Sequence, residues 1–278
     1  MPNTLDVKAT EPKKIFMTGD TGSGKTTQFL TLPGKKYIYL FDPNAKLALR
    51  GYDVDYDEYL PTTVSAAVSS LTKGKADSRG TTTSDVYQRF ESEFDQRIKS
   101  GFFDPYDWLG FDSATTLLDL IMDRVLTMNG RFGQWPQQDD YGPQMAAFIN
   151  MCRTVTAMGK GLYVTGHLEE KQDQITKRIT TRPMMTGRLI VKVPLLFSDV
   201  FVAGSDLDEK GNVVYTIQTV RSGNLVACRT SIKGLNPIEN VTIQWFEKNK
   251  DNEIIKKLDP VGQGLGGILS WEARQANI

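Results

Sequence analysis

An eight-residue glycine-rich run near the N-terminus constrains this chain more than any other feature. Residues 19–26, with the sequence GDTGSGKT, fit the pattern G-x-x-x-x-G-K-[ST] at every fixed position. The apolar run 14–18 before it predicts a buried strand, and residues 26–30 after it predict the first turns of a helix. A loop of this pattern between a strand and a helix predicts a site that wraps a phosphate chain.

The residue types of this loop suit phosphate binding. Glycines let the backbone turn tightly, so that successive N–H groups point at the phosphates, and the helix N-terminus adds partial positive charge. We expect Lys25 to reach the β- and γ-phosphates of ATP and Thr26 to hold Mg²⁺. The predicted nucleotide-binding residues are Gly19, Asp20, Thr21, Gly22, Ser23, Gly24, Lys25, Thr26 and Thr27. The alternative is a glycine-rich turn with a chance Lys-Thr pair.

Composition limits the class of protein. The 278 residues suffice for one large α/β domain or two small ones. Basic and acidic residues number 33 each, so any basic surface must be local. Two distant cysteines exclude a cysteine-based zinc module and fit a reducing compartment. Because the sequence shows neither a signal-peptide apolar region nor a membrane-length apolar run, we predict a cytoplasmic protein.

A second strand is predicted to complete the phosphate site. The hydrophobic run 106–111 ends in Asp112. A carboxylate at the carboxyl end of a strand beside the phosphate loop can hold Mg²⁺ through a water. The alternative is an aspartate that only caps the next helix, and the loop upstream favours the metal role. His167, the single histidine, ends a further strand and is either a γ-phosphate contact or a hydrogen-bonded loop residue.

Hydrophobic periodicity assigns the other elements. Strands are predicted at 36–41, 162–167, 200–204, 213–219, 225–229 and 241–246. Helices are predicted at 63–71, 84–100, 114–128 and 144–158. We expect 213–219 and 225–229 to pair as antiparallel strands through a Gly-Asn turn. The polar run 72–83 predicts a mobile loop.

Two segments carry candidate DNA contacts. The irregular segment 131–143 contains Arg131 and Trp135, which can stack on bases, although two adjacent aspartates count against this. The chain then becomes basic between 169 and 192, which suits a flexible loop that follows a phosphate backbone. The alternative is a solvated basic loop. The candidate contacts there are Lys171, Lys177, Arg178, Arg182 and Arg188.

The order of these elements resembles the RecA-like ATPase core, and most of all the short phage recombination ATPases of the single-strand annealing type. The resemblance spans about residues 13–246. It implies an α/β fold with a RecA-like P-loop NTPase core, in which helices flank a mostly parallel central sheet that C-terminal antiparallel strands extend. From composition, the polar residues 1–12 are expected to form a flexible N-terminal arm, and 247–278, charged and then glycine-rich, a C-terminal tail that is not assigned to the core.

The resemblance also implies roles for single residues. Asp112 matches the Walker B carboxylate, and His167 matches a polar γ-phosphate sensor. Residues 129–143 and 169–188 match the two DNA-binding loops. Arg221 lies where RecA carries a Lys-Asn-Lys turn that reaches the nucleotide of a neighbouring subunit.

The sequence departs from the RecA pattern at the general base. RecA-like ATPases place a glutamate just after the second strand, and here the strand ends Asp42-Pro43-Asn44. Asn44, the best-matching residue, cannot accept a proton, so we expect Asp42 to substitute and hydrolysis to be slow or to act as a switch. The chain also lacks room for RecA's large C-terminal domain, and the phenylalanine of its polymerisation motif is not evident in residues 1–12.

We therefore predict a Mg²⁺-dependent ATPase that binds single-stranded DNA in phage recombination or annealing. The resemblance implies a homo-oligomer, either ring or filament, and a single-strand-binding protein as a further partner. One alternative is a helicase or helicase loader, which would unwind duplex. Another is a nucleotide-gated binding or assembly module with little turnover, which Asn44 favours. A small-molecule kinase ranks last, because no arginine-rich lid is obvious beyond residues 171–192.

Overall fold

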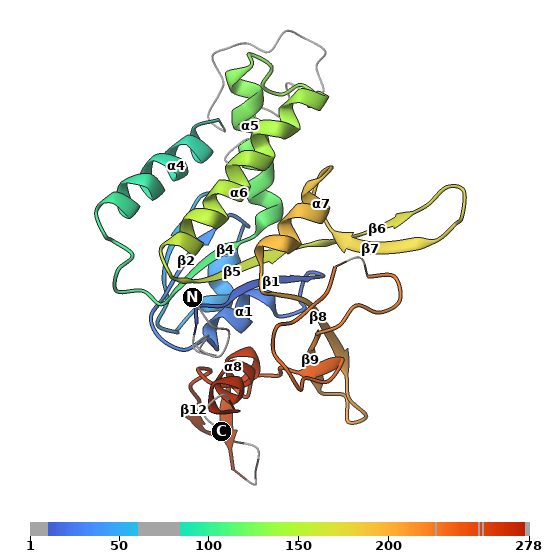
Figure 1. Cartoon of the computed structure of the whole chain (residues 1–278). Coiled ribbons are helices and arrows are strands. Elements are labelled where there is room, and N and C mark those ends of the chain that lie inside the picture. The colour runs from blue at the N-terminus through green and yellow to red at the C-terminus, as the bar shows by residue number, and fades with distance from the viewer. Residues whose placement is uncertain (1–10, 61–83, 226, 250, 252, 276–278) are drawn as a thin grey trace, which may run out of the picture.

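An eight-stranded sheet runs through the middle of the molecule in this computed structural model, which describes residues 11–60, 84–225, 227–249, 251 and 253–275 (Figure 1). The strand order is β10-β9-β8-β1-β5-β4-β2-β3. Six neighbouring strands are parallel: β8 (Asp199–Leu207), β1 (Lys14–Gly19), β5 (Gly161–Gly166), β4 (Trp108–Asp112), β2 (Lys36–Leu40) and β3 (Asp55–Glu58). The antiparallel strands β9 (Val213–Gln218) and β10 (Ile238–Asn240) extend one edge. The predicted fold class, an α/β fold with a mostly parallel central sheet extended by antiparallel strands, is confirmed.

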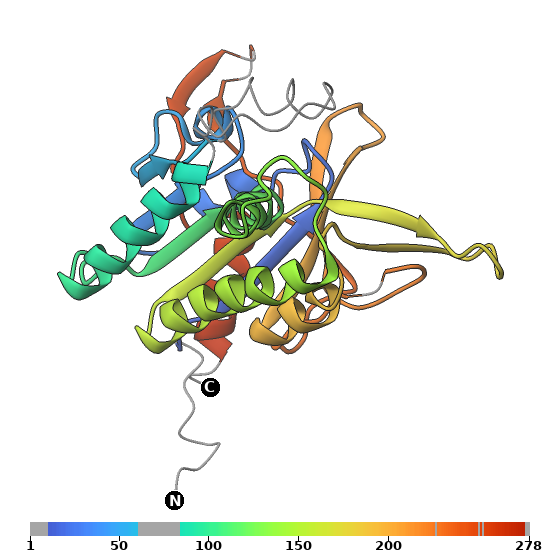
Figure 2. The ribbon, with the colours of Figure 1, turned by 90° about the horizontal axis from the view of Figure 1, so that it is seen from above.

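Helices cover both faces of this sheet (Figure 2). One face carries α4 (Ser84–Lys99), α5 (Ala114–Met128), α6 (Tyr141–Ala157) and the short α7 (Leu189–Lys192). The other carries α1 (Lys25–Leu30), α2 (Ala45–Leu49) and α8 (Gly264–Gln275). No helix within the described ranges is long and apolar enough to cross a membrane.

The central strands are apolar on both sides because each side faces a helical layer. In β1, Phe16 joins the core beneath α4, α5 and α6, whereas Ile15 and Met17 join the core beneath α1 and α8. In β2 the same alternation places Tyr37 and Tyr39 in the core beneath α4, α5 and α6. The continuous apolar runs in the sequence thus follow from burial on both faces.

The three long helices predicted from periodicity are present. Helix α5 has the predicted bounds, and α4 ends one residue early. Helix α6 begins at Tyr141, three residues before the prediction, because a 3-10 turn over Gln138–Asp140 leads into it and proline is tolerated in a first helical turn. Helix α2 and strand β3 went unpredicted, since their residues 45–58 are mixed in character and β3, the sequence DYDE, is a charged edge strand.

Two predicted strands are wrong. The described residues of this segment, 225 and 227–229, make only isolated bridges, at Leu225 and Arg229, and β9 pairs instead with β8 and β10. Residues 241–245 form no strand, although the alternating Val241 and Ile243 are buried. An irregular segment laid against a core gives the same period-two pattern as a strand. Nearby, β11 (Phe246–Lys248) and β12 (Ile254–Lys257) form a separate two-stranded sheet.

The basic segment predicted as a flexible loop is largely an antiparallel hairpin. Strands β6 (Leu168–Gln172) and β7 (Ile179–Pro183) pair over five residues and project from the body of the molecule (Figure 2). The Asp173 carboxylate organises the turn by accepting the Ile175 and Thr176 N–H groups at 2.9 and 2.7 Å. The β-branched residues 175, 176 and 179–181 favour strand structure, and the charge pattern concealed this signal.

The expectation that the chain after residue 246 is a tail apart from the core is also wrong. Helix α8 packs against α1, and its Leu265 is fully buried. Three other predictions lie outside the described residues: the helix at 63–71, the loop at 72–83 and the first ten residues of the N-terminal arm.

Candidate functional site

The glycine-rich loop joins the carboxyl end of β1 to the start of α1, as predicted. Two of its glycines are required by the geometry. Gly24 has φ +82°, which L-residues rarely adopt. A Cβ on Gly19 would lie 2.5 Å from the Ala203 carbonyl oxygen of the neighbouring strand β8. The loop therefore keeps the close backbone path that phosphate binding needs.

Lys25 folds back onto this loop. Its Nζ donates to the carbonyl oxygens of Gly19 and Asp20 at 2.9 and 2.7 Å, and the side chain is buried. Burial lowers the pKa of Lys25, and the nearby carboxylates of Asp112, Asp42 and Asp20 oppose this shift. Phosphate oxygens would bind the ammonium more strongly than these neutral carbonyls do.

Asp112 and Thr26 meet beside the loop. Thr26 Oγ1 donates to Asp112 Oδ2 at 2.7 Å, and Thr165 Oγ1 donates to Oδ1. Asp112 is 3% exposed, and burial raises the pKa of its carboxyl even though these hydroxyls and Lys25 pull it down. A buried carboxylate next to a threonine hydroxyl is an oxygen pair of the kind Mg²⁺ uses with phosphates and waters. The described residues contain no cluster of three His, Cys, Asp or Glu that would enclose a metal alone. The pair fits Mg²⁺ bound jointly with a nucleotide.

Asp42 follows β2 and lies at the centre of a hydrogen-bond network. Its Oδ1 accepts from Ser113 Oγ at 3.0 Å and from Thr116 Oγ1, and its Oδ2 lies 3.3 Å from His167 Nε2. Burial alone would raise the pKa of Asp42, but hydrogen bonds from His167, Thr116 and Ser113 outweigh it and hold the pKa below the ordinary value. Asp42 is therefore a charged carboxylate at neutral pH.

Asn44 has a different place. It is exposed, has φ +66° and sits at the N-terminus of α2. Asparagine tolerates this left-handed conformation better than most residues. Of the two residues that the sequence offered as matches to a general base, the structure brings Asp42, rather than Asn44, into the network beside Asp112.

His167 connects this network to the hairpin. Strand β5 lies between β1 and β4, so residues at its carboxyl end lie between the phosphate loop and Asp112. The His167 N–H donates to Thr115 Oγ1 at 3.1 Å, and the His167 carbonyl accepts from the Met184 N–H at 2.8 Å. Because β6 begins at the next residue, His167 contacts Asp42 with its ring and the base of the hairpin with its backbone.

Tyr215 is a site residue that sequence reasoning missed. Its ring lies 3.0 Å from the point where a Cβ on Gly24 would be, so it packs on the phosphate loop. Val213 and Leu207 pair across β9 and β8 on the same sheet face, two residues further out, and are 48% and 65% exposed. Together they form an aromatic and apolar surface beside the phosphate loop. No local signal could have found it, because it depends on where β9 lies in the sheet.

A family model described as an AAA domain matches residues 11–227, which is more than half of the chain. The chain belongs to this family. The predicted P-loop class is thereby confirmed, whereas ATP hydrolysis and the recombination type remain predictions. No curated protein matches the sequence.

Two solved structures are similar to this AAA domain at low sequence identity. A KaiC-like protein from Pyrococcus horikoshii OT3 is 14% identical with a TM-score of 0.41, and the alignment covers 84% of this chain and 87% of that one. The flagellar accessory protein FlaH from Methanocaldococcus jannaschii is 12% identical with a TM-score of 0.40, covering 87% and 92%.

The AAA domain places the predicted DNA contacts in two groups. Arg131 pairs with the Asp140 carboxylate, which also accepts from Asn129 at 2.9 Å, so it ties the α5–α6 connection together. Trp135 in the same connection is 92% exposed. On the hairpin, Arg182 Nε pairs with Glu169 at 2.7 Å. The other predicted contacts are exposed: Lys171, Lys177, Arg178 and Arg188.

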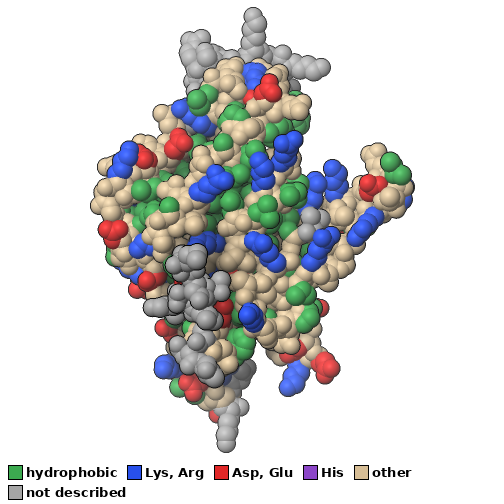
Figure 3. Space-filling view, in the orientation of Figure 1, with side chains coloured by type: hydrophobic (Ala, Val, Ile, Leu, Met, Phe, Trp, Pro, Cys, Tyr) green, Lys and Arg blue, Asp and Glu red, His purple; other side chains and the backbone are tan. Residues whose placement is uncertain are grey.

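Positive charge gathers on one face of the AAA domain. Lysine and arginine side chains spread over α6, α7 and the hairpin in Figure 3, and few acidic side chains lie among them. We call this the basic face. The exposed lysines and arginines of these elements are Arg153, Lys171, Lys177, Arg178, Arg188 and Lys192. Arg153 was not predicted, because it stands alone on the outer side of a helix.

Arg221 lies in the segment after β9. It is exposed, and its Nε donates to the Leu225 carbonyl at 3.0 Å. The predicted turn between two paired strands is not present, since residues 225 and 227–229 belong to no strand. The predicted contact of Arg221 with a neighbouring subunit's nucleotide remains a prediction.

Proposed function

We propose that this protein is a Mg²⁺-dependent ATPase that binds single-stranded DNA, of the phage recombination or annealing type. The observation that carries the proposal is the double contact of His167. Its ring lies 3.3 Å from Asp42 in the nucleotide site, and its backbone holds Met184 at the base of the basic hairpin. A change at the nucleotide therefore has a short covalent and hydrogen-bonded route to the hairpin.

The basic face supports the choice of a nucleic acid as partner. A chain with equal numbers of acidic and basic residues displays, on the face seen in Figure 3, a patch of lysine and arginine with few acidic side chains among them. Such a patch attracts a phosphate backbone without regard to sequence. Trp135, almost fully exposed, offers a surface on which an unpaired base can stack. Unpaired bases are available for stacking in single strands and not in duplex.

Each residue of the site has a separate role in hydrolysis. Lys25 binds the phosphates, and Thr26 and Asp112 would hold Mg²⁺, which neutralises charge on the β- and γ-phosphates when bound. Asp42 orients the attacking water and accepts its proton. His167 donates toward Asp42 or toward the γ-phosphate.

A second candidate, a nucleotide-gated assembly module with little turnover, is favoured by the environment of Asp42. Its carboxylate is already engaged by Ser113, Thr116 and His167, and these bonds lower its pKa. A base with a lowered pKa accepts a proton poorly. This module would bind ATP and DNA but would hydrolyse ATP slowly in every condition.

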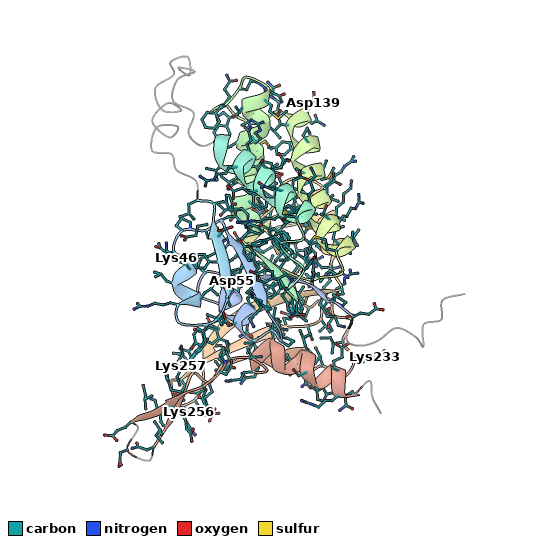
Figure 4. All side chains as sticks on the ribbon, turned by 90° about the vertical axis from the view of Figure 1, so that its left-hand side faces the viewer. Lys46, Asp55, Asp139, Lys233, Lys256 and Lys257 are labelled. Carbon is teal, nitrogen blue, oxygen red and sulfur yellow. The ribbon has the colours of Figure 1, made fainter. Side chains whose placement is uncertain are left out.

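ATP turnover with and without single-stranded DNA tests the proposal. We expect single-stranded DNA to raise turnover and duplex DNA to have little effect. The Arg178→Ala variant should lose much of the stimulation but keep the basal rate, because Arg178 is exposed on the hairpin. A matched control is Lys256→Ala. Lys256 and Lys233 lie toward the end of the molecule that carries α8 and β12, away from Asp139 of the α5–α6 connection (Figure 4).

Each outcome separates the candidates. Turnover that DNA does not change, with tight binding of both ligands, favours the assembly module. Stimulation by duplex, with strand separation, favours a helicase. Equal loss of stimulation in Arg178→Ala and Lys256→Ala contradicts a DNA site on the hairpin. We further propose that the active form is a homo-oligomer and that a single-strand-binding protein is a partner.

A further inference from the structure

The glycine-rich run near the C-terminus is bound to the far end of the P-loop helix. The Gly262 N–H donates to the Thr31 carbonyl at 2.9 Å, and the Gly266 N–H donates to Thr31 Oγ1 at 2.9 Å. The Leu265 N–H donates to Gln28 Oε1 at 2.9 Å. We call this set of contacts the C-terminal clasp. It joins the last turn of α1 to the first turn of α8.

Gln28 is the central side chain of the clasp. While its Oε1 accepts from Leu265, its Nε2 donates to the Val241 carbonyl at 2.8 Å. Gln28 is 2% exposed, and Thr31 and Leu265 are fully buried. A buried amide with both ends paired fixes its neighbours, because moving either partner leaves a buried polar group unsatisfied.

The clasp explains two of the glycines in this run, Gly264 and Gly266. A Cβ on Gly266 would lie 1.7 Å from the Thr31 carbonyl oxygen, and one on Gly264 would lie 2.5 Å from Gln28 Oε1. The backbone of α8 therefore rests directly on α1 with no room for side chains. Such close contact transmits small shifts of one helix to the other.

The position of α1 matters because its first turn carries the phosphate-binding groups. The helix has six residues, too few to be stable without tertiary contacts. Its start is fixed by Tyr163 Oη, which donates to the Lys25 carbonyl at 2.6 Å, and by the bond from Thr26 to Asp112. The clasp fixes its other end. Small misplacements of binding groups have large effects on rate and affinity.

We infer that Gln28 and the glycine run 262–267 are positioning residues for the P-loop, so that nucleotide binding and the docking of α8 are thermodynamically linked. The inference rests on the nucleotide site of the proposed function and is independent of DNA binding. The α8 side of the clasp lies beyond residues 11–227, the part that the AAA domain model matches. Linkage is reciprocal: loosening the clasp weakens nucleotide binding, and bound nucleotide tightens the clasp.

Calorimetric binding of Mg·ADP to Gln28→Met tests the first half. Methionine has a similar size and cannot make the two amide bonds. We expect binding about tenfold weaker, within the usual range of coupling between sites. The matched control is Lys99→Ala, which breaks an ion pair with Asp95 within α4, on the opposite face of the sheet from α1 and α8. Both are measured well below their melting temperatures. Unchanged affinity in Gln28→Met, or an equal loss in Lys99→Ala, overturns the inference.

Hydrogen exchange of the wild-type protein tests the second half. The amides of Gly262, Leu265 and Gly266 donate to α1, and we expect Mg·ADP to slow their exchange several-fold. The Lys25→Ala variant should show no such slowing. Exchange that Mg·ADP leaves unchanged in wild type, although Mg·ADP binds, overturns the linkage. A wild type that binds no Mg·ADP overturns the nucleotide site itself, so the two failures are distinguishable.

Discussion

Asp42 is the carboxylate that we propose to activate the water attacking the γ-phosphate. Ser113 and Thr116 donate to one of its oxygens, and the ring of His167 faces the other. These contacts orient the carboxylate but also lower its pKa. A well-oriented and weakly basic group is suited to slow, controlled hydrolysis.

Replacing Asp42 by asparagine should separate binding from hydrolysis. We expect Asp42→Asn to lower turnover by about 100-fold, the lower end of general-base effects, because the amide cannot accept the proton. Affinity for Mg·ADP should stay within about twofold, since Asp42 is not among the predicted phosphate contacts. Asn44→Gly is the control, because glycine also adopts the left-handed backbone of this residue. Loss of turnover in Asn44→Gly would show that the base was wrongly assigned.

Asp42 should also make stability depend on acid pH. Its folded pKa lies below its ordinary value of 3.8, so the unfolded chain binds more protons in the interval between the two. Its contribution to the free energy of unfolding is therefore complete above pH 3.8 and is lost as the pH falls through the lower, folded value. Urea unfolding of wild type and Asp42→Asn along a pH series measures this effect. We expect the difference between their free energies of unfolding to shrink as the pH falls.

Asp123 on α5 serves as a control, because its contribution to stability should change with pH in the opposite direction. Burial raises the pKa of its carboxyl to about 6. Wild type should therefore lose stability relative to Asp123→Asn as the pH rises from its ordinary value of 3.8 to about 6. The same trend for both residues would contradict the assigned hydrogen bonds of Asp42.

At the scale of elements, local sequence patterns predicted a helix or strand correctly where the surroundings of that element are uniform along its length. The two-sided burial of β1 and the stripe of α4 appear directly in the sequence. They were not sufficient for the hairpin β6–β7, whose charges mask its β-branched residues, nor for 241–245, which alternates without pairing. Tyr215 shows the same limit for the site, because strand pairing brings it to Gly24 from far along the chain.

The hairpin should supply salt-dependent DNA affinity. Each lost phosphate contact flattens the plot of log K against log salt by about 0.7 for single strands. Replacing Lys171, Lys177 and Arg178 by alanine should therefore flatten it by roughly two units if all three contact phosphates. These three are exposed, whereas Arg182 is paired with Glu169 and should contribute less. An unchanged slope in filter-binding titrations would show that the hairpin is solvated and does not contact the DNA phosphates.

At the scale of the whole molecule, the sequence predicts the class of fold, whereas strand order and the docking of α8 depend on long-range contacts. The AAA domain match ends at residue 227, yet the chain beyond it contributes α8 to the core beneath α1. The predicted boundary at residue 246 rested on charge and glycine content. Glycine there marks close packing, and composition alone does not distinguish that from a loose tail.

The nucleotide site is expected to be completed by a second copy. A guanidinium such as that of Arg221 can stabilise charge on a transferred phosphoryl group. Subunits with Lys25→Ala cannot use their own nucleotide but can supply Arg221 to the site of a neighbour. Subunits with Arg221→Ala keep a functional Lys25 but cannot supply Arg221. We expect each variant alone to be inactive and the mixture to regain ATPase activity. Normal turnover by Arg221→Ala, or specific activity independent of protein concentration, rules out this role.

Strand β1 lies far in sequence from both of its neighbours in the sheet. Its partners β5 and β8 pair with it across the register Lys14–Leu162 and Ile15–Asp199. On the ribosome, this apolar strand therefore has no native neighbour until β5 has been made. Pairing over such separations is slow, and exposed apolar strands aggregate. The residues of α8 that hold the far end of the P-loop helix follow their partners by 235 and 237 residues, so the phosphate loop is synthesised well before them.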